Sequence, residues 1–265
     1  MRTKTKYFVV EPRGVVALVT INHPPRNFLR TGMLYELNDL LDEWEREGVR
    51  AVVITGGVRD YFIAHADLQL VRDAEPSHPK AYQSLRFWHQ ALTRLGTCAP
   101  VIIAAINGQA LGGGCEFALA CDFRFMARGP KKIGLIEVQL GIMPGAGGTQ
   151  RMARLLGRAK SLELILEGKA LTADEAERVG LVHRALDPDR LLPESLAYAE
   201  KLARWSPVAV RNIKRAIHEG LEMPLAQGLE LETACFYETM TTEVAKKTLE
   251  AGIRAYAEGR EPGFE

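Results

Sequence analysis

The chain has 265 residues, of which 47% are hydrophobic and 25% charged, a composition typical of a globular protein with one large core and a smaller appendage. Lys and Arg number 34 against 33 Asp and Glu, a net charge of +1, so no global field predicts binding to nucleic acid or to an anionic membrane. The sequence predicts no signal peptide or membrane span, so we expect a cytoplasmic protein. Its 4 cysteines form no CxxC pair, and we therefore expect no disulfides. Its 6 histidines form no HxxxH pair, so no metal site is expected.

Strands and helices alternate in the first half of the chain. Apolar spacing and turn residues predict, in order, a strand at Val15–Ile21, a helix at Thr31–Glu47, a strand at Ala51–Ile54, a helix at Ala81–Leu95 and a buried strand at Pro100–Ile106. This alternation is typical of an α/β protein.

A glycine-rich turn follows the buried strand. Gly112, Gly113 and Gly114 precede a helix-favouring stretch, Cys115–Cys121, with Glu116 in its first turn. The first N–H groups of a helix have no partner within the helix and carry partial positive charge. Without side chains in the way, these N–H groups can approach a developing oxyanion closely. The segment therefore predicts an oxyanion-binding turn beside a carboxylate.

A second carboxylate, Glu137, lies in an apolar run before another glycine-rich turn that opens a helix at Thr149–Leu156. Two glutamates in apolar surroundings suit general acid/base catalysis, because burial raises a carboxyl pKa and a neighbouring carboxylate separates the two values.

Plainer interpretations exist for each of these residues. Glu116 complements a helix dipole equally well, and Glu137 fits a surface position at a strand end. For Gly145, Gly147 and Gly148 we prefer simple turn geometry. Asp67 is interpreted as a helix cap rather than a catalyst, and the cysteines as small apolar fillers.

Only helices are predicted after Ser206, a good N-cap followed by Pro207. One helix is expected at Val208–Glu219 and one long helical tract at Leu225–Ala257. We therefore divide the chain into a core at 1–203 and a helical domain at 204–265.

Six segments in chain order carry a resemblance to a known family: Asn22–Asn27, Tyr61–Leu68, the Gly-Gly-Gly-x-Glu signature in Leu111–Asp122, Pro144–Leu155 with Pro-Gly-x-Gly-Gly-Thr-Gln-Arg, Leu171–Ala176 followed by Val179–Val182, and Arg260–Phe264. With these motifs the chain resembles the crotonase superfamily, and within it the enoyl-CoA hydratases. The resemblance implies an α/β spiral of repeated β-β-α units, with a C-terminal helical region that packs on neighbouring subunits in a homotrimer or hexamer.

The resemblance also implies roles for individual residues. The backbone N–H groups of Ala66 and Gly113 form the oxyanion hole, and Glu116 and Glu137 are the two catalytic carboxylates of a hydratase. Coenzyme A, as part of the thioester substrate, is expected to contact seven residues: Arg26, Ala64, His65, Asp67, Leu68, Gln69 and Phe264. No metal or redox cofactor is expected.

The implied reaction is reversible hydration of a trans-2-enoyl-CoA to 3-hydroxyacyl-CoA, as in fatty-acid β-oxidation. Isomerases of the superfamily usually keep only the counterpart of Glu137, and the presence of Glu116 favours hydration. The chain departs from the family pattern at Phe28, His65 and Ile136, where the family commonly has a small residue, Gly and Pro.

Two alternatives stay open. One is another reaction on an acyl-CoA, by a Δ3-Δ2 isomerase, a decarboxylase or a thioester hydrolase with the same oxyanion hole. The other is an RNA-binding or scaffolding relative. Basic residues cluster in the tail at Arg204, Arg211, Lys214, Arg215 and His218, although a solvated or subunit-facing helix explains them equally well.

Overall fold

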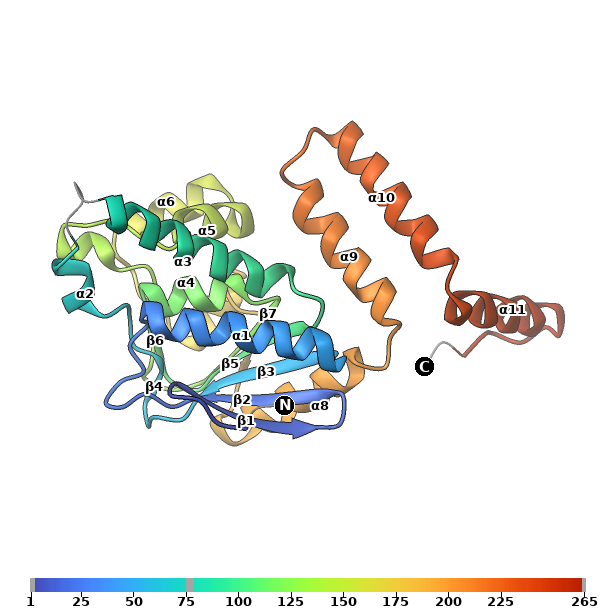
Figure 1. Ribbon diagram of the computed structural model, residues 1–265, viewed down its shortest axis with the longest axis horizontal. Coiled ribbons are helices and arrows are strands. Elements are labelled where there is room, and N and C mark those ends of the chain that lie inside the picture. Colours follow the sequence, from blue (N-terminus) through green and yellow to red (C-terminus); the bar gives the residue numbers. More distant parts are fainter. Residues whose placement is uncertain (1–2, 75–78, 264–265) are drawn as a thin grey trace. The chain divides into compact units, whose positions relative to one another are not determined.

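The computed structural model describes residues 3–74 and 79–263, and the chain divides into two compact units, Met1–Ala203 and Arg204–Glu265 (Figure 1). A six-stranded sheet runs through the first unit in the order β1-β2-β3-β5-β7-β9. Its strands are β1 (Phe8–Arg13), β2 (Val16–Ile21), β3 (Ala51–Gly56), β5 (Val101–Ile106), β7 (Phe123–Ala127) and β9 (Arg184–Leu186). Strands β1 and β2 are antiparallel, and all later pairs are parallel. Every residue of β3 and β5 is buried, which explains their continuous apolar runs.

A second, three-stranded parallel sheet contains β4 (Tyr61–Ile63), β6 (Gln109–Leu111) and β8 (Ile133–Gly134). The two sheets alternate along the chain: β3, β5 and β7 enter the large sheet, and the strand after each of them enters the small sheet. A helix follows each small-sheet strand. The expected spiral of β-β-α units is therefore confirmed.

The helices of the first unit, with one short 3-10 helix (η1), are α1 (Thr31–Glu47), α2 (Leu68–Arg72), α3 (Pro79–Thr97), α4 (Gly113–Ala120), η1 (Glu137–Leu140), α5 (Gly148–Leu156), α6 (Arg158–Leu166), α7 (Ala173–Arg178) and α8 (Pro188–Leu202). Helix α1 buries the apolar face that the sequence predicts, from Met33 to Trp44, and ends at Gly48 with φ 70°. The family-like segment at Val179–Val182 forms a turn, and β9 begins two residues later.

The C-terminal end of α4 is held by a buried cation. Arg124 is 4% exposed. Its guanidinium donates to the carbonyl oxygens of Cys121 (2.7 Å) and Leu181 (2.9 Å). Burial lowers the pKa of Arg124. These bonds satisfy the terminal carbonyl of α4 and fasten the helix to the segment before β9.

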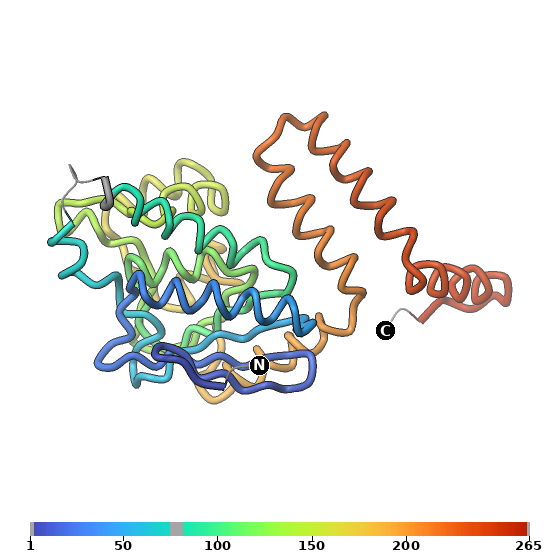
Figure 2. Tube along the Cα trace, in the orientation of Figure 1, coloured from blue at the N-terminus to red at the C-terminus, as the bar shows by residue number. Residues whose placement is uncertain are grey.

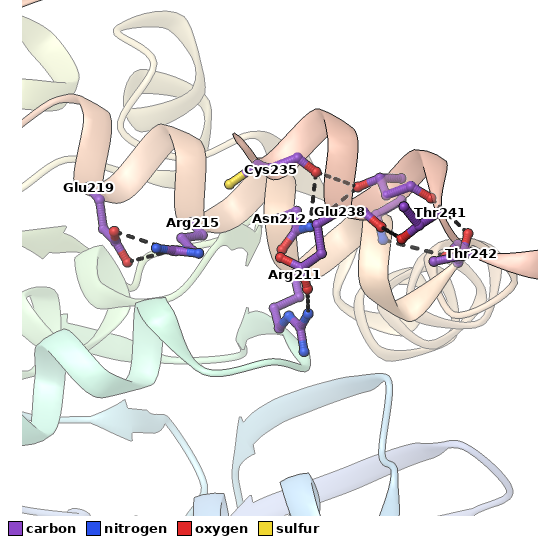
Figure 3. Close-up of polar contacts among 11 residues, drawn as sticks. Arg211, Asn212, Arg215, Glu219, Cys235, Glu238, Thr241 and Thr242 are labelled. Carbon is purple, nitrogen blue, oxygen red and sulfur yellow. Dashed lines mark hydrogen bonds and ion pairs between the residues drawn. The ribbon is translucent and has the colours of Figure 1, made fainter. Parts of the chain in front are cut away.

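The second unit contains α9 (Pro207–Gly220), α10 (Leu225–Met240) and α11 (Glu243–Ala257). Helices α9 and α10 run side by side as an antiparallel pair (Figure 2), joined by a hydrogen bond from Asn212 Nδ2 to the Cys235 carbonyl (3.1 Å). The prediction of one helical tract at Leu225–Ala257 is wrong. Thr242 ends that continuity because its hydroxyl caps α11, accepting from Ala245 N (3.2 Å) and donating to the Thr239 carbonyl (2.8 Å) (Figure 3).

Among the described residues, no helix is both long and apolar enough to cross a bilayer.

Candidate active site

The predicted catalytic positions follow the C-terminal ends of the three small-sheet strands. Ala66 comes three residues after β4, Gly113 two residues after β6, and Glu137 three residues after β8. Because the strands are parallel, their ends lie at the same edge of the sheet. One edge thus brings together three positions that are spread over more than 70 residues of the sequence.

Close backbone contact explains the glycines at 112–114. Gly112 is the N-cap of α4 with φ 50°, a conformation that favours glycine. A Cβ on Gly113 would lie 2.9 Å from Ala66 N, and a Cβ on Gly114 would lie 2.1 Å from the Ile63 carbonyl oxygen. The loop after β4 therefore packs directly on the start of α4, and side chains at 113 or 114 would push it away.

The peptide that joins His65 to Ala66 is oriented by its neighbour at Leu29. Leu29 N donates to the His65 carbonyl (2.9 Å), and Asp67 N donates to the Leu29 carbonyl (3.0 Å). In a trans peptide the N–H points opposite to the C=O, so the first bond turns Ala66 N–H away from Leu29. Neither Ala66 N–H nor Gly113 N–H donates to an acceptor within the described chain. The two segments that carry these N–H groups are in direct contact.

Glu116 lies in the first turn of α4 and is 3% exposed. Its Oε1 accepts hydrogen bonds from Ala146 N (2.7 Å) and Gly148 N (2.8 Å). Burial raises the pKa of Glu116, and the two backbone donors and the charge of Arg151 oppose that shift. The plainer interpretation of Glu116 as a helix-end carboxylate does not account for these two bonds.

Glu137 begins η1, with Ile136 as its N-cap, and is 9% exposed. A Cβ on Gly112 would lie 3.1 Å from Glu137 Oε1, so the carboxyl group lies against the Gly112–Gly114 turn. Its Oε2 is buried and has no hydrogen-bond partner in the described residues. Burial and the charge of Glu116 raise the pKa of Glu137 to about 7. The expectation of an ionisable group in apolar surroundings is met, and the surface alternative is wrong.

The predicted binding residues gather beside this site. A pocket of about 420 Å³ is lined by five of them, Arg26, His65, Asp67, Leu68 and Gln69. Ala64 does not line the pocket: it is buried, and its carbonyl accepts from Leu111 N (3.1 Å). Phe264 lies outside the described residues.

Asp67 is the N-cap of α2, where its Oδ1 accepts from Gln69 N (2.9 Å), and it pairs with Arg30. The cap interpretation of Asp67 is confirmed.

Two departures from the family pattern contact each other. The rings of Phe28 and His65 lie 4.8 Å apart between centroids, tilted by 41°, and both line the pocket. His65 Nδ1 donates to the Ala66 carbonyl (2.7 Å). Only Asn27 and Asp60 have positive φ among the described non-glycine residues, so His65 carries no left-handed strain.

The second glycine-rich turn has a role that its sequence pattern did not predict. Its N–H groups bind Glu116, so simple turn geometry is an incomplete interpretation of Gly145, Gly147 and Gly148. The sequence signal was available, because Ala146 and Gly148 lie at a helix start, where N–H groups lack partners. No group of three or more His, Cys, Asp or Glu residues suited to a metal ion occurs in residues 3–74 and 79–263.

Residues 11–265 match the family model of enoyl-CoA hydratase/isomerase. A probable enoyl-CoA hydratase of Rhizobium meliloti is 37% identical over 97% of this chain and 96% of its own length. A short-chain-enoyl-CoA hydratase of Clostridium acetobutylicum is 37% identical over 92% and 94%.

A crystal structure of an enoyl-CoA hydratase from Geobacillus kaustophilus superposes with a TM-score of 0.89 at 34% identity, covering 98% of this chain and 97% of that one. A structure of Pseudomonas aeruginosa DspI gives 0.86 at 35% identity, over 98% and 97%. The architecture is the crotonase fold. The chain belongs to the enoyl-CoA hydratase/isomerase family.

Proposed function

We propose that this protein hydrates a trans-2-enoyl-CoA thioester to the 3-hydroxyacyl-CoA. The observation that carries the proposal is that two buried carboxylates, Glu116 and Glu137, flank the Gly112–Gly114 turn, which packs directly on the backbone of Ala66. Hydration of a conjugated thioester needs these three elements: a site for the enolate-like oxygen, a base for water and an acid for the α-carbon.

In the proposed mechanism, Ala66 N–H and Gly113 N–H donate to the thioester carbonyl and stabilise the negative charge that develops on its oxygen. Glu116 takes a proton from water as the water oxygen bonds to the β-carbon. Glu137 donates its proton to the α-carbon. The hydroxyl group of water is then on the β-carbon and the proton from Glu137 is on the α-carbon. Glu116 is left protonated and Glu137 negatively charged. Transfer of a proton from Glu116 to Glu137 restores the starting state.

The charge states support this division of roles. A pKa of about 7 keeps a large fraction of Glu137 protonated at neutral pH, as an acid requires. Glu116 accepts two N–H hydrogen bonds on one oxygen, and these bonds favour the carboxylate form that a base requires, although burial raises the pKa of Glu116 overall. The pocket beside Ala66, lined by Arg26 and Arg30, suits a phosphate-bearing ligand. The reaction draws on no metal or redox cofactor.

The test is loss of the absorbance of the conjugated double bond when the purified protein meets crotonyl-CoA. The wild type should remove the absorbance, and a Glu116→Gln, Glu137→Gln double variant should not. An unchanged absorbance with crotonyl-CoA and with longer enoyl-CoA thioesters would contradict the proposal.

A second candidate, Δ3-Δ2 isomerisation, is favoured by one observation. Among the carboxyl groups of the described residues, Glu137 alone combines a pKa of about 7 with an unpartnered oxygen, as a single proton-shuttling carboxyl requires. Gain of absorbance with a 3-enoyl-CoA, retained in Glu116→Gln, would identify the isomerase.

We also propose that the protein is cytoplasmic and assembles as a homotrimer or hexamer through the C-terminal helices. Its partner in catalysis is the acyl-CoA alone, with no nucleic acid and no membrane.

A further inference from the structure

The loop Gly145–Gly148 is held on both sides. On one side Ala146 N and Gly148 N donate to Glu116 Oε1 (2.7 and 2.8 Å). On the other side the carbonyls of the same segment accept bonds from α3 and α5. His89 Nε2 donates to the Gly145 carbonyl (2.7 Å), and Arg151 N donates to the Gly147 carbonyl (2.9 Å).

These bonds fix the planes of two peptides. The Gly145 carbonyl and Ala146 N–H belong to one planar peptide, and the Gly147 carbonyl and Gly148 N–H belong to another. A donor on each carbonyl therefore sets the direction of the N–H that reaches Glu116. Hydrogen bonds in such a chain also polarise one another, which strengthens the bonds to the carboxylate.

The Arg151 side chain braces the middle of the loop. Its Nη1 donates to the Ala146 carbonyl (2.9 Å) and its Nη2 to Thr93 Oγ1 on α3 (3.1 Å). A Cβ on Gly147 would lie 2.2 Å from Nη1, so the guanidinium packs directly on the loop backbone. Arg151 lies near the N-terminus of α5, where the helix dipole disfavours a cation, and burial lowers its pKa. The position is costly for a cation, and the contacts with the loop explain why one is there.

We propose that Arg151 is a positioning residue for Glu116. Its guanidinium donates to the Ala146 carbonyl and to Thr93, and it thereby holds the loop whose N–H groups donate to Glu116. The hydrogen bond from His89 to the Gly145 carbonyl holds the same loop at a second point. The proposal rests on the proposed function, because Glu116 is the base there. Glu116 interacts electrostatically with four charged or titratable groups of the described residues: Arg151 on α5, His89 on α3, Glu137 on η1 and the Cys115 thiol on α4.

The test compares Arg151→Gln with Arg154→Gln, which removes the same charge from the same helix at an exposed position whose guanidinium bonds to Gln150. Because small displacements of a reacting group cost up to about 100-fold, Arg151→Gln should lower kcat by about 10- to 100-fold with KM nearly unchanged. The acid limb of the kcat–pH profile should move to higher pH, because the carboxylate loses both a nearby cation and well-aligned donors. Arg154→Gln should match the wild type in both.

Two further variants separate geometry from charge and from folding. Arg151→Lys keeps the charge, but its ammonium lacks the planar fork that spans Ala146 and Thr93, so kcat should stay low. Thr93→Val removes one acceptor at an exposed position and should lower kcat by about two- to five-fold. Full activity in Arg151→Lys would overturn the positioning role and leave a purely electrostatic one. Wild-type kcat and pH profile in both Arg151→Gln and Thr93→Val would overturn the proposal altogether.

Titration of Glu116 in the protein without substrate makes the proposal independent of the reaction. In a sample with ¹³C-labelled glutamate carboxyl groups, the Glu116 resonance is the one absent from Glu116→Gln. Its titration should move to higher pH in Arg151→Gln and not in Arg154→Gln. If hydration fails in the wild type but this shift occurs, the proposed function is wrong and the positioning role stands. If the wild type hydrates the substrate but the shift is absent, the proposed function stands and the positioning role of Arg151 is wrong.

Discussion

The two glycine-rich turns of the site look alike in sequence and use their N–H groups in opposite ways. At Gly112–Gly114 the N–H of Gly113 has no acceptor in the described chain. At Gly145–Gly148 the N–H groups of Ala146 and Gly148 donate to Glu116. The first turn leaves the N–H of Gly113 without an acceptor in the described chain, and the second turn uses its N–H groups to hold a side chain. A glycine-rich helix start is therefore a device for close backbone contact, and its surroundings decide what the contact serves.

Removing the donor of the first turn should have the largest effect. Gly113→Pro deletes the N–H and adds a ring whose Cβ would lie 2.9 Å from Ala66 N. Loss of one oxyanion donor costs about 10²- to 10³-fold, and displacement of Ala66 adds to it. Hydratase kcat should fall by more than about 10³-fold, measured with crotonyl-CoA. Circular dichroism must show an intact fold, and a folded variant with normal turnover would refute the oxyanion assignment.

Substitution of the carboxylates comes next. Glu116→Gln and Glu137→Gln should each lower hydratase kcat by about 10²- to 10⁴-fold, with the fold and coenzyme A binding retained. Glu116→Gln also tests the second turn, because an amide oxygen still accepts from Ala146 N and Gly148 N but cannot act as a base. Near-wild-type hydration in Glu116→Gln would mean that its only role is structural and that one carboxylate does the chemistry.

The raised pKa of Glu137 should appear in stability as well as activity. Its pKa is about 7 in the folded chain and about 4.3 when unfolded. Between these values the folded state binds more protons, so the free energy of unfolding falls as pH rises. Glu137→Gln removes that dependence. Its Tm should exceed that of the wild type by a few degrees at pH 8 and approach it near pH 4.5.

The same titration limits catalysis on the alkaline side. Because Glu137 is the acid in the proposed mechanism, kcat of the wild type should fall as pH rises through about 7. Scanning calorimetry and the pH–rate profile measure the two effects separately. A Tm difference between Glu137→Gln and the wild type that does not vary with pH would exclude a raised pKa.

His65→Gly should have the smallest effect, because the turn that carries Ala66 is held by its backbone. The Leu29 N–H bond to the residue 65 carbonyl survives the substitution, whereas the ring contact with Phe28 and the bond to the Ala66 carbonyl are lost. Turnover of crotonyl-CoA should stay within about three-fold and KM should change. No gain in stability is expected, since residue 65 has no positive φ to relieve. A collapse of kcat in His65→Gly would give His65 a direct catalytic role.

Much of the fold could be predicted because its signals are local. The apolar face of α1 follows from the spacing of its apolar residues, and the buried strand β5 from its β-branched residues. Gly48 marks the C-terminus of α1 as a left-handed cap, and Ser206 marks the N-terminus of α9 as a side-chain cap. The break at Thr241–Thr242 was missed because threonine is both tolerated inside a helix and a good cap, and the sequence alone does not show which role it takes.

The site was predictable to the extent that backbone geometry requires glycine. Gly113 and Glu116 could be identified because three glycines before a helix have few explanations. Arg151, His89 and Arg124 were missed as contributors because their contacts are with carbonyl oxygens of distant segments, and every residue type supplies the same carbonyl. Side chains that bind main-chain oxygens leave no complementary residue in the sequence to identify them.

The alternation of strands between the two sheets has a consequence for how new activities arise on this scaffold. Ala66, Gly113 and Glu137 come from successive turns of the spiral, each just beyond a small-sheet strand. In the proposed mechanism, polarisation of the thioester carbonyl depends on main-chain groups, which nearly any substitution preserves, whereas proton transfer depends on two replaceable side chains. On that mechanism, exchange of a single residue after β6 or β8 would redirect the chemistry of the activated thioester and leave the means of activating it unchanged.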